Sequence, residues 1–127
     1  MSYEVEYTDE FATWWNRLTV REQEDVRPVV RLLEERGTRL GHPYSSKVNG
    51  SRHGRMRELR VQSGGGPIRI FYAFDPRRTA ILLIGGHKRE HDRFYESYVR
   101  RADAIYDQHL QQLRREGLLQ PERGWER

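Results

Sequence analysis

Three apolar-rich runs between residues 56 and 85 constrain the fold of this chain more than any other feature. They cover residues 56–62, 68–75 and 79–85. The runs at 68–75 and 79–85 contain many of the β-branched or aromatic side chains that favour strands, whereas Val61 is the one such residue in the run at 56–62. Only short turn-forming segments, at residues 64–67 and 75–78, separate the runs, so neighbouring runs should pair as antiparallel hairpins. The sequence therefore predicts a three-stranded meander.

The N-terminal part predicts one strand and a helical hairpin. Residues 3–7 alternate aromatic or β-branched side chains with glutamates, which is the period of a half-buried strand. Asp9 is expected to cap the first helix, and Thr19 and Glu22 have the spacing of a capping box for the second. Pro28 lies inside the second helical pattern, so we expect a kink or a later helix start there.

The remaining segments predict one loop, one helix and one tail. Residues 38–55 are polar, contain several glycines and show no periodicity, so we expect a long loop. Apolar side chains recur at helical spacing from residue 92 to 115, which predicts a helix packed on the sheet. Residues 1–116 should then form a single α+β domain, and residues 117–127 a flexible C-terminal tail.

Composition narrows the class of protein. The 127 residues contain no cysteine, which excludes disulfides, thiolate nucleophiles and cysteine-based zinc sites. The N-terminus lacks the features of a secretory signal, and no run approaches the roughly 20 apolar residues of a membrane span. We therefore expect a cytoplasmic protein with no membrane partner.

Positive charge is concentrated in the middle of the chain. The net charge is +4, and residues 47–93 contain 11 lysines and arginines against four acidic residues, so the rest of the chain is net acidic. Strand alternation places Arg57 on one face of the first run and Arg60 on the other. Removing an unpaired guanidinium from water costs roughly several kcal/mol of desolvation free energy, so we expect an anionic partner at this surface. Nucleic acid is a natural candidate.

Three segments of the central region carry a family resemblance. They are MRELR at 56–60, IRIFYAFD at 68–75 and AILLIGGHK at 80–88. With the order of the predicted elements, they resemble the RelE/ParE superfamily of bacterial type II toxins, in its HigB-like, phage-derived branch. The resemblance covers about residues 3–113 and implies a RelE-like fold. It also implies a ribosome-dependent endoribonuclease that cuts mRNA on the 70S ribosome, and a cognate antitoxin, HigA-like with a helix-turn-helix.

The resemblance also implies site residues. Arg69 matches the arginine that opens the second meander strand of RelE-like nucleases. Lys88 and Arg89 match the basic pair after their last strand, and Tyr95 matches a late tyrosine. Glu58 stands where well-known members carry a basic residue, which leaves the identity of the general base open.

Metal-independent RNA cleavage needs a base for the 2′-hydroxyl proton, cations for the phosphate and an acid for the leaving oxygen. Proton transfer is assigned to histidine, with lysine or tyrosine as alternates, because arginine cannot titrate near neutral pH. The predicted catalytic set is Arg69, Arg89, Lys88, His87, His91 and Tyr95. The predicted RNA-binding set is Lys47, Arg52, His53, Arg55, Arg57 and Arg60. We expect no metal and no cofactor.

Alternatives to this assignment stay open. Arg69 can instead form an ordinary ion pair with Glu58 across the hairpin, and Tyr95 can belong partly to the core. The H-x-x-E-H pattern that begins at His87 resembles a zinc-protease signature, but it follows a predicted strand rather than lying on a helix. At the level of function, the alternatives are a ParE-like inhibitor of DNA gyrase without chemistry and a non-catalytic RNA-binding module.

Overall fold

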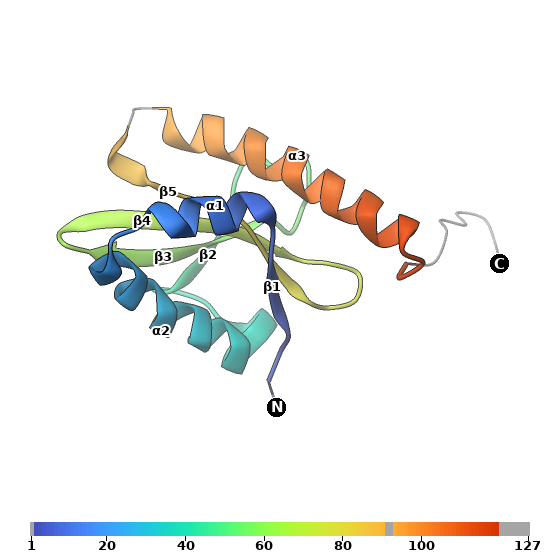
Figure 1. The fold of residues 1–127 in the computed structure, drawn as a ribbon, viewed down its shortest axis with the longest axis horizontal. Helices are drawn as coiled ribbons and strands as arrows, with labels where there is room; N and C mark the ends of the chain where they lie inside the picture. Colours follow the sequence, from blue (N-terminus) through green and yellow to red (C-terminus); the bar gives the residue numbers. More distant parts are fainter. Residues whose placement is uncertain (1, 91–92, 120–127) are drawn as a thin grey trace.

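A five-stranded mixed sheet forms the centre of this computed structural model, which describes residues 2–90 and 93–119 (Figure 1). The strands are β1 (Val5–Tyr7), β2 (Ser45–Lys47), β3 (Arg57–Ser63), β4 (Gly66–Phe74) and β5 (Ala80–His87). The helices are α1 (Asp9–Arg17), α2 (Val20–Arg36) and α3 (Phe94–Arg115). Two short 3-10 turns, η1 (Gly37–Arg39) and η2 (Lys88–Glu90), complete the described elements. None of the described helices is long and apolar enough to cross a membrane.

The sheet has the order β1-β5-β4-β3-β2. Strands β3, β4 and β5 pair antiparallel, so the predicted meander is confirmed. Strand β1 pairs parallel to β5 at one edge, and β2 pairs antiparallel to β3 at the other. The prediction of a long loop over residues 38–55 is wrong in part, because η1 overlaps its start and β2 lies within it. Ser45–Lys47 carries no apolar alternation, and it is held at the edge by backbone pairing with β3.

Two layers of helix cover the sheet. Helices α1 and α2 pack on one face, against a core that includes Leu59, Val61 and Ile70. Helix α3 packs on the other face, against a core that includes Met56 and Phe71. Figure 1 shows α2 and α3 on opposite sides of the strands. The predicted division of β3 into two faces is therefore confirmed.

The helix starts differ in part from the sequence-based expectation. Thr8, not Asp9, caps α1, because its hydroxyl oxygen accepts from the Phe11 backbone N–H at 3.0 Å. The capping box of Thr19 and Glu22 is confirmed. Helix α2 begins at Val20 and continues through Pro28, so a later start is wrong. The described part of the last helix begins at residue 94, and residues 120–127 lie outside the description, so the predicted tail stays a prediction.

A β-bulge in β5 alters which side chains face which helices. Phe71 pairs with Ile84 while Tyr72 pairs with Leu82, so one residue of β5 has no partner on β4. The bulge reverses the alternation beyond it. As a result Gly85 lies against Trp14 of α1, and Gly86 lies against Tyr98 of α3.

Adding a methyl group at Gly85 should destabilise the domain. A Cβ there would lie 2.4 Å from the Trp14 ring, so Gly85→Ala forces the ring or the strand to move. Overpacking of this kind costs about 1–3 kcal/mol. Gly41→Ala is the matched control, because a Cβ at Gly41 meets nothing within 4 Å. Thermal denaturation should show a lowered Tm for Gly85→Ala alone; equal Tm values for the two variants would contradict this packing.

Candidate active site

Four polar side chains from three elements meet on the α3 face of the sheet. Glu58 and Arg60 come from β3, Arg69 from β4 and Tyr95 from the first turn of α3. Arg60 and Arg69 are paired across the two strands, and Glu58 is paired with Phe71. Because residues two apart on a strand share a face, the pairing brings the carboxylate and both guanidinium groups together.

Glu58 is the centre of this cluster and is only 4% exposed. Its Oε1 accepts a hydrogen bond from the Tyr95 hydroxyl at 2.7 Å and lies 3.7 Å from Arg69 Nε. Its Oε2 accepts from Arg60 Nη1 at 3.0 Å and from Ser46 Oγ at 2.8 Å. An internal carboxylate therefore faces two of the predicted catalytic and RNA-binding arginines. Glu58 thus supplies an anion to this face from within the chain, and the external anionic partner stays a prediction.

Arg69 is almost completely buried, with its side chain 6% exposed. Its Nε donates to the Tyr95 hydroxyl oxygen at 3.3 Å, and its Nη1 donates to the Ile68 carbonyl at 3.1 Å. The alternative in which Arg69 pairs with Glu58 across the hairpin is confirmed. Such a buried cation acts on the site mainly through its charge and through the orientation of Tyr95.

Tyr95 presents a half-buried phenol at the edge of the cluster. Its ring packs edge-on against Phe71 and Phe94, so the interpretation as partly core is confirmed. The Lys88 ammonium lies 5.4 Å from the centre of the same ring, within the range of a cation–π contact. Burial, followed by the hydrogen bond to Glu58, raises the pKa of the Tyr95 hydroxyl above its usual value, against a smaller opposing effect of Arg69. The hydroxyl therefore keeps its proton at neutral pH.

The other predicted catalytic residues are distributed more widely. Arg89 is exposed and donates to the Gly65 carbonyl in the β3–β4 turn. His87 lies beyond the bulge and is paired with Ile68, on the face that α1 and α2 cover. His91 lies outside the described residues.

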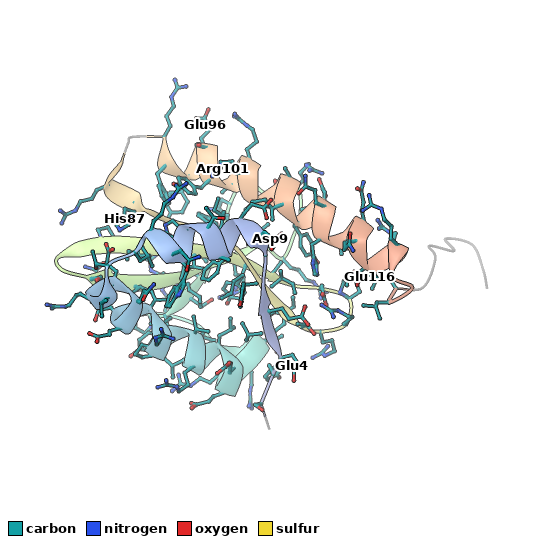
Figure 2. All side chains as sticks on the ribbon, in the orientation of Figure 1. Glu4, Asp9, His87, Glu96, Arg101 and Glu116 are labelled. Carbon is teal, nitrogen blue, oxygen red and sulfur yellow. The ribbon has the colours of Figure 1, made fainter. Side chains whose placement is uncertain are left out.

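His87 binds α2 instead of joining the cluster. Its Nε2 lies 2.6 Å from Glu22 Oε2, in the first turn of that helix, and Figure 2 labels His87 near this end of the sheet. The hydrogen bonds from the Thr19 backbone and from His87 lower the pKa of Glu22. His87 was predicted in one catalytic set with Arg69 and Tyr95, and the fold separates it from them.

The described part of the histidine-rich segment, residues 87–90, does not form the α-helix that a zinc-protease signature requires. His87 is the last residue of β5, and Lys88–Glu90 is a 3-10 turn. Within residues 2–90 and 93–119 no group of three or more histidine, aspartate or glutamate side chains has an arrangement that could hold a metal ion.

Two of the predicted RNA-binding residues instead attach the β2–β3 connection to α3. Arg52 Nη2 and His53 Nε2 both contact the Asp107 carboxylate, the latter at 2.9 Å. Ser51 Oγ contacts Asp103 in the preceding helical turn. The hydrogen bond from Arg52, together with that from His53, holds the pKa of Asp107 below its usual value, although burial opposes them. These contacts therefore attach residues 51–53 of the β2–β3 connection to α3.

The other predicted RNA-binding residues lie on the two faces of β3 and its neighbours. Arg60 joins Glu58 on the α3 face, as described above. Lys47, Arg55 and Arg57 line one pocket on the α2 side. The predicted set is thus three separate groups rather than one continuous surface.

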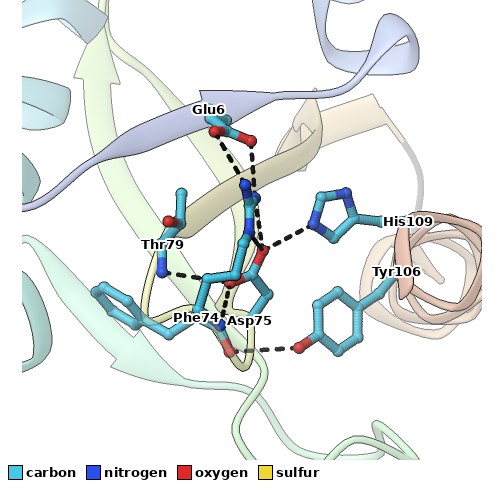
Figure 3. Close-up of polar contacts among 7 residues, drawn as sticks. Glu6, Phe74, Asp75, Thr79, Tyr106 and His109 are labelled. Carbon is cyan, nitrogen blue, oxygen red and sulfur yellow. Dashed lines mark hydrogen bonds and ion pairs between the residues drawn. The ribbon is translucent and has the colours of Figure 1, made fainter. Parts of the chain in front are cut away.

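A second polar network surrounds Asp75 at the β4–β5 turn (Figure 3). Asp75 Oδ2 accepts from Arg77 Nη2 at 2.8 Å and contacts His109 Nε2 of α3 at 2.9 Å. Arg77 Nη2 also donates to Glu6 of β1 at 2.9 Å. Burial alone would raise the pKa of Asp75, but the hydrogen bonds from Arg77, His109 and the Thr79 backbone outweigh it and lower the pKa. The network links β1, the β4–β5 turn and α3. It is separate from the cluster of Glu58, Arg60, Arg69 and Tyr95, which we call the Tyr95 cluster.

Sequence reasoning missed the role of Glu58 as the common acceptor. Glu58 was predicted only as a departure from the family pattern or as the ion-pair partner of Arg69, and not as the acceptor for Tyr95, Arg60 and Ser46. The signal was present in the alternation of β3, because Glu58 and Arg60 share a face that the hairpin then aligns with Arg69. The hydrogen bond from Ser46 to Glu58 could not be predicted from the sequence, since β2 itself was not predicted.

Comparison with known sequences identifies relatives of this chain. Residues 13–107 match the family described as phage derived protein Gp49-like. HigB2 of Mycobacterium tuberculosis (strain ATCC 25618 / H37Rv) is 39% identical over 107 residues, which are 83% of this chain and 53% of HigB2. HigB3 of the same strain is 42% identical over 91 residues, which are 71% of this chain and 78% of HigB3. The chain spans about half the length of HigB2.

Two solved structures share the arrangement of elements. A mutant of the E. coli toxin RelE in the free state superposes with a TM-score of 0.57 at 14% identity, over 79% of this chain and 98% of RelE. A chain of the RelE–RelB complex from Pyrococcus horikoshii OT3 gives a TM-score of 0.52 at 15% identity, over 72% of this chain and 100% of that chain. At these identities the likeness shows the fold alone. The predicted α+β, RelE-like fold is confirmed.

Proposed function

The chain belongs to the Gp49-like family of phage-derived proteins, and from that premise we propose that it is the toxin of a type II toxin–antitoxin system. The predicted resemblance to the HigB-like branch is confirmed by HigB2 and HigB3, both named as toxins. We propose further that the toxin is an endoribonuclease that cleaves mRNA by attack of the 2′-hydroxyl. The observation that carries this proposal is the hydrogen bond of 2.7 Å from the half-buried Tyr95 hydroxyl to the buried Glu58 carboxylate.

Tyr95 and Glu58 together supply the base. The carboxylate is surrounded by protein donors and is 4% exposed, so RNA would reach it only through the phenol. The Tyr95 oxygen takes the proton of the RNA 2′-hydroxyl while its own proton passes to Glu58 Oε1. A phenol with a raised pKa keeps its proton at neutral pH, so by itself it is a poor base. The adjacent Glu58 carboxylate makes the transfer possible because it accepts the hydroxyl proton of Tyr95 as the phenol oxygen takes the proton of the RNA.

The bonds at phosphorus change in the same step. The 2′-oxygen bonds to the adjacent phosphorus, the bond from phosphorus to the 5′-oxygen breaks, and a 2′,3′-cyclic phosphate forms. The leaving 5′-oxygen takes a proton from the Lys88 ammonium, which lies over the Tyr95 ring, and becomes a 5′-hydroxyl. Water then restores the proton on Lys88 and takes one from the Tyr95 hydroxyl, while the proton on Glu58 Oε1 returns to the Tyr95 oxygen.

The arginines stabilise the negative charge that develops on the phosphate. Arg60 and the exposed Arg89 offer guanidinium groups to the non-bridging oxygens, whose geometry the planar fork matches. Arg69 is buried beside Glu58 and contributes its fixed charge and the orientation of Tyr95. His91 stays a predicted candidate for proton transfer, and His87 contributes only by fixing the end of β5 to α2 in this scheme.

The proposed partners follow from the same assignment. Translating 70S ribosomes would present the mRNA, which sets the reaction in the cytoplasm. A cognate antitoxin, HigA-like with a helix-turn-helix, would neutralise the toxin. A RelE–RelB complex is known for one structural neighbour, and the exposed cations of this chain suit an acidic or amphipathic segment.

Product analysis in a reconstituted translation reaction tests the proposal. We expect primer extension to detect cleavage of a reporter mRNA only when ribosomes are present, and end-labelling to find 5′-hydroxyl and 2′,3′-cyclic phosphate ends. Those ends are the signature of 2′-hydroxyl attack, whereas attack by water would leave a 5′-phosphate or a 3′-phosphate without the cycle. Intact mRNA together with inhibition of DNA supercoiling by gyrase would favour the ParE-like alternative and reject the nuclease.

A further inference from the structure

Three cationic side chains line a pocket on the α2 side of the sheet. It is lined by Thr38, Lys47, Gly54, Arg55, Arg57 and Phe74 and encloses about 350 Å³. Its lining includes no acidic side chain. Lys47 and Arg57 face each other across β2 and β3, and Arg55 comes from the connection between these strands.

Arg57 is held in this pocket by buried groups. Its Nε donates to Ser45 Oγ at 3.0 Å, and the same oxygen lies 2.6 Å from the Tyr72 hydroxyl oxygen. Ser45 is 0% exposed and Tyr72 is 1% exposed, so the orientation of the guanidinium depends on the core. Its two terminal nitrogens form no hydrogen bond with a described residue and are available to a ligand.

The other two cations are also unpaired within the described chain. Neither Lys47 nor Arg55 forms an ion pair with a residue in 2–90 or 93–119, and both are exposed. Three like charges around one pocket repel one another, and a bound anion would relieve that repulsion. A phosphate group suits the site, because an oriented arginine can bind two of its oxygens while flexible side chains contact the others.

We propose that this pocket binds a backbone phosphate of the RNA, at a subsite separate from the Tyr95 cluster. The inference rests on the proposed nuclease function and deepens it. Arg57 and Glu58 are consecutive on β3 and point to opposite faces of the sheet. An RNA strand that engages both sites passes around the β2 edge, and the pocket fixes its path on the far side of that edge.

Binding of a non-cleavable RNA tests the subsite directly. The probe is a fluorescent single-stranded 2′-O-methyl RNA, whose blocked 2′-oxygen cannot attack phosphorus, and the readout is anisotropy from about 50 to 200 mM salt. We expect Lys47→Gln and Arg57→Gln each to raise the Kd several-fold. Each should also make the slope of log K against log salt shallower by about 0.7, the value for one lost phosphate contact on a single strand.

Arg17→Gln is the matched control, because Arg17 is exposed at the end of α1 and lies outside the pocket. It makes the same change in net charge and should leave the slope within error of wild type. Thermal denaturation checks that the core beneath Arg57 is intact, and Lys47→Gln provides a variant that does not touch that core. Equal effects of the pocket and control variants, or no RNA binding by the wild-type chain, would overturn the inference.

Competition and cleavage separate the remaining outcomes. Inorganic phosphate that displaces the RNA at micromolar concentration would assign the pocket to a free anion and overturn the assignment to RNA. Cleavage on ribosomes by wild type, with pocket variants that bind RNA like wild type, would overturn the subsite and leave the nuclease standing. RNA binding through the pocket without any cleavage would uphold the subsite and reject the nuclease.

Discussion

Tyr95→Phe should lower the rate of mRNA cleavage by about 100- to 10,000-fold, which is the usual contribution of a positioned acid–base group. The substitution removes only the hydroxyl that donates to Glu58 and keeps the ring contacts with Phe71 and Phe94. The cationic surroundings are unchanged, so binding of RNA should persist. The measurement is the initial rate of cleavage in the translation reaction at matched protein concentration.

Tyr106→Phe is the matched control for this prediction. Tyr106 also lies on α3, its hydroxyl donates to the Phe74 carbonyl at 3.3 Å, and burial raises its pKa as it does for Tyr95. Tyr106→Phe loses one hydrogen bond, which should cost about 1 kcal/mol of stability, whereas Tyr95→Phe loses the bonds to Glu58 and from Arg69 and should cost more, so cleavage is compared at a temperature where both variants stay folded. Only Tyr95→Phe should affect cleavage. A similar loss of cleavage in both variants would mean that stability, rather than chemistry, limits the reaction.

A double-mutant cycle distinguishes a proton relay from a purely structural hydrogen bond. Glu58→Gln keeps the size of the side chain but leaves a group that cannot accept the proton from Tyr95. If the two residues act as one unit, the double variant should cleave no more slowly than the slower single variant. Independent effects that multiply in the double variant would argue against the relay.

The fold was largely predictable because its main elements are periodic. The meander and the apolar stripes of the helices depend on alternation that the sequence displays directly. β2 was not predictable, since Ser45 is buried through a hydrogen bond to Tyr72 and not through apolar character. Thr8 rather than Asp9 caps α1 because its hydroxyl also donates to the Leu83 carbonyl at 2.7 Å, a contact 75 residues away in sequence.

The candidate site was predictable only in part, for a similar reason. Arg69 and Tyr95 came from the family resemblance, and the pairing of Glu58 with Arg69 across the hairpin was one alternative, whereas the contact of Glu58 with Tyr95 was not predicted. His87 was grouped with them because it is close to Arg89 in sequence, whereas the bulge near Ile84 turns it to the other face. A bulge depends on how two strands pair, and periodicity within one strand does not show it.

Asp75→Asn should lower the free energy of unfolding by about 3–5 kcal/mol, the usual cost of removing one partner from a buried ion pair. The Asp75 side chain is 0% exposed, and asparagine would turn amide hydrogens toward the donors of Arg77 and His109. For a domain of this size the corresponding fall in Tm is about 10–20 °C. Thermal denaturation at neutral pH, followed by circular dichroism, gives the measurement.

Acid titration and a matched variant complete this test. Because the folded-state pKa of Asp75 is lowered, its stabilisation is fully present above the unfolded pKa of about 3.9 and is lost as the pH falls through the folded value. Wild type should therefore lose more stability than Asp75→Asn between about pH 5 and pH 2. Asp107→Asn is the control, since Asp107 also contacts an arginine and a histidine but its side chain is 37% exposed. Exposed pairs contribute about 0–1 kcal/mol, so an equal loss in both variants would contradict the importance of burial at Asp75.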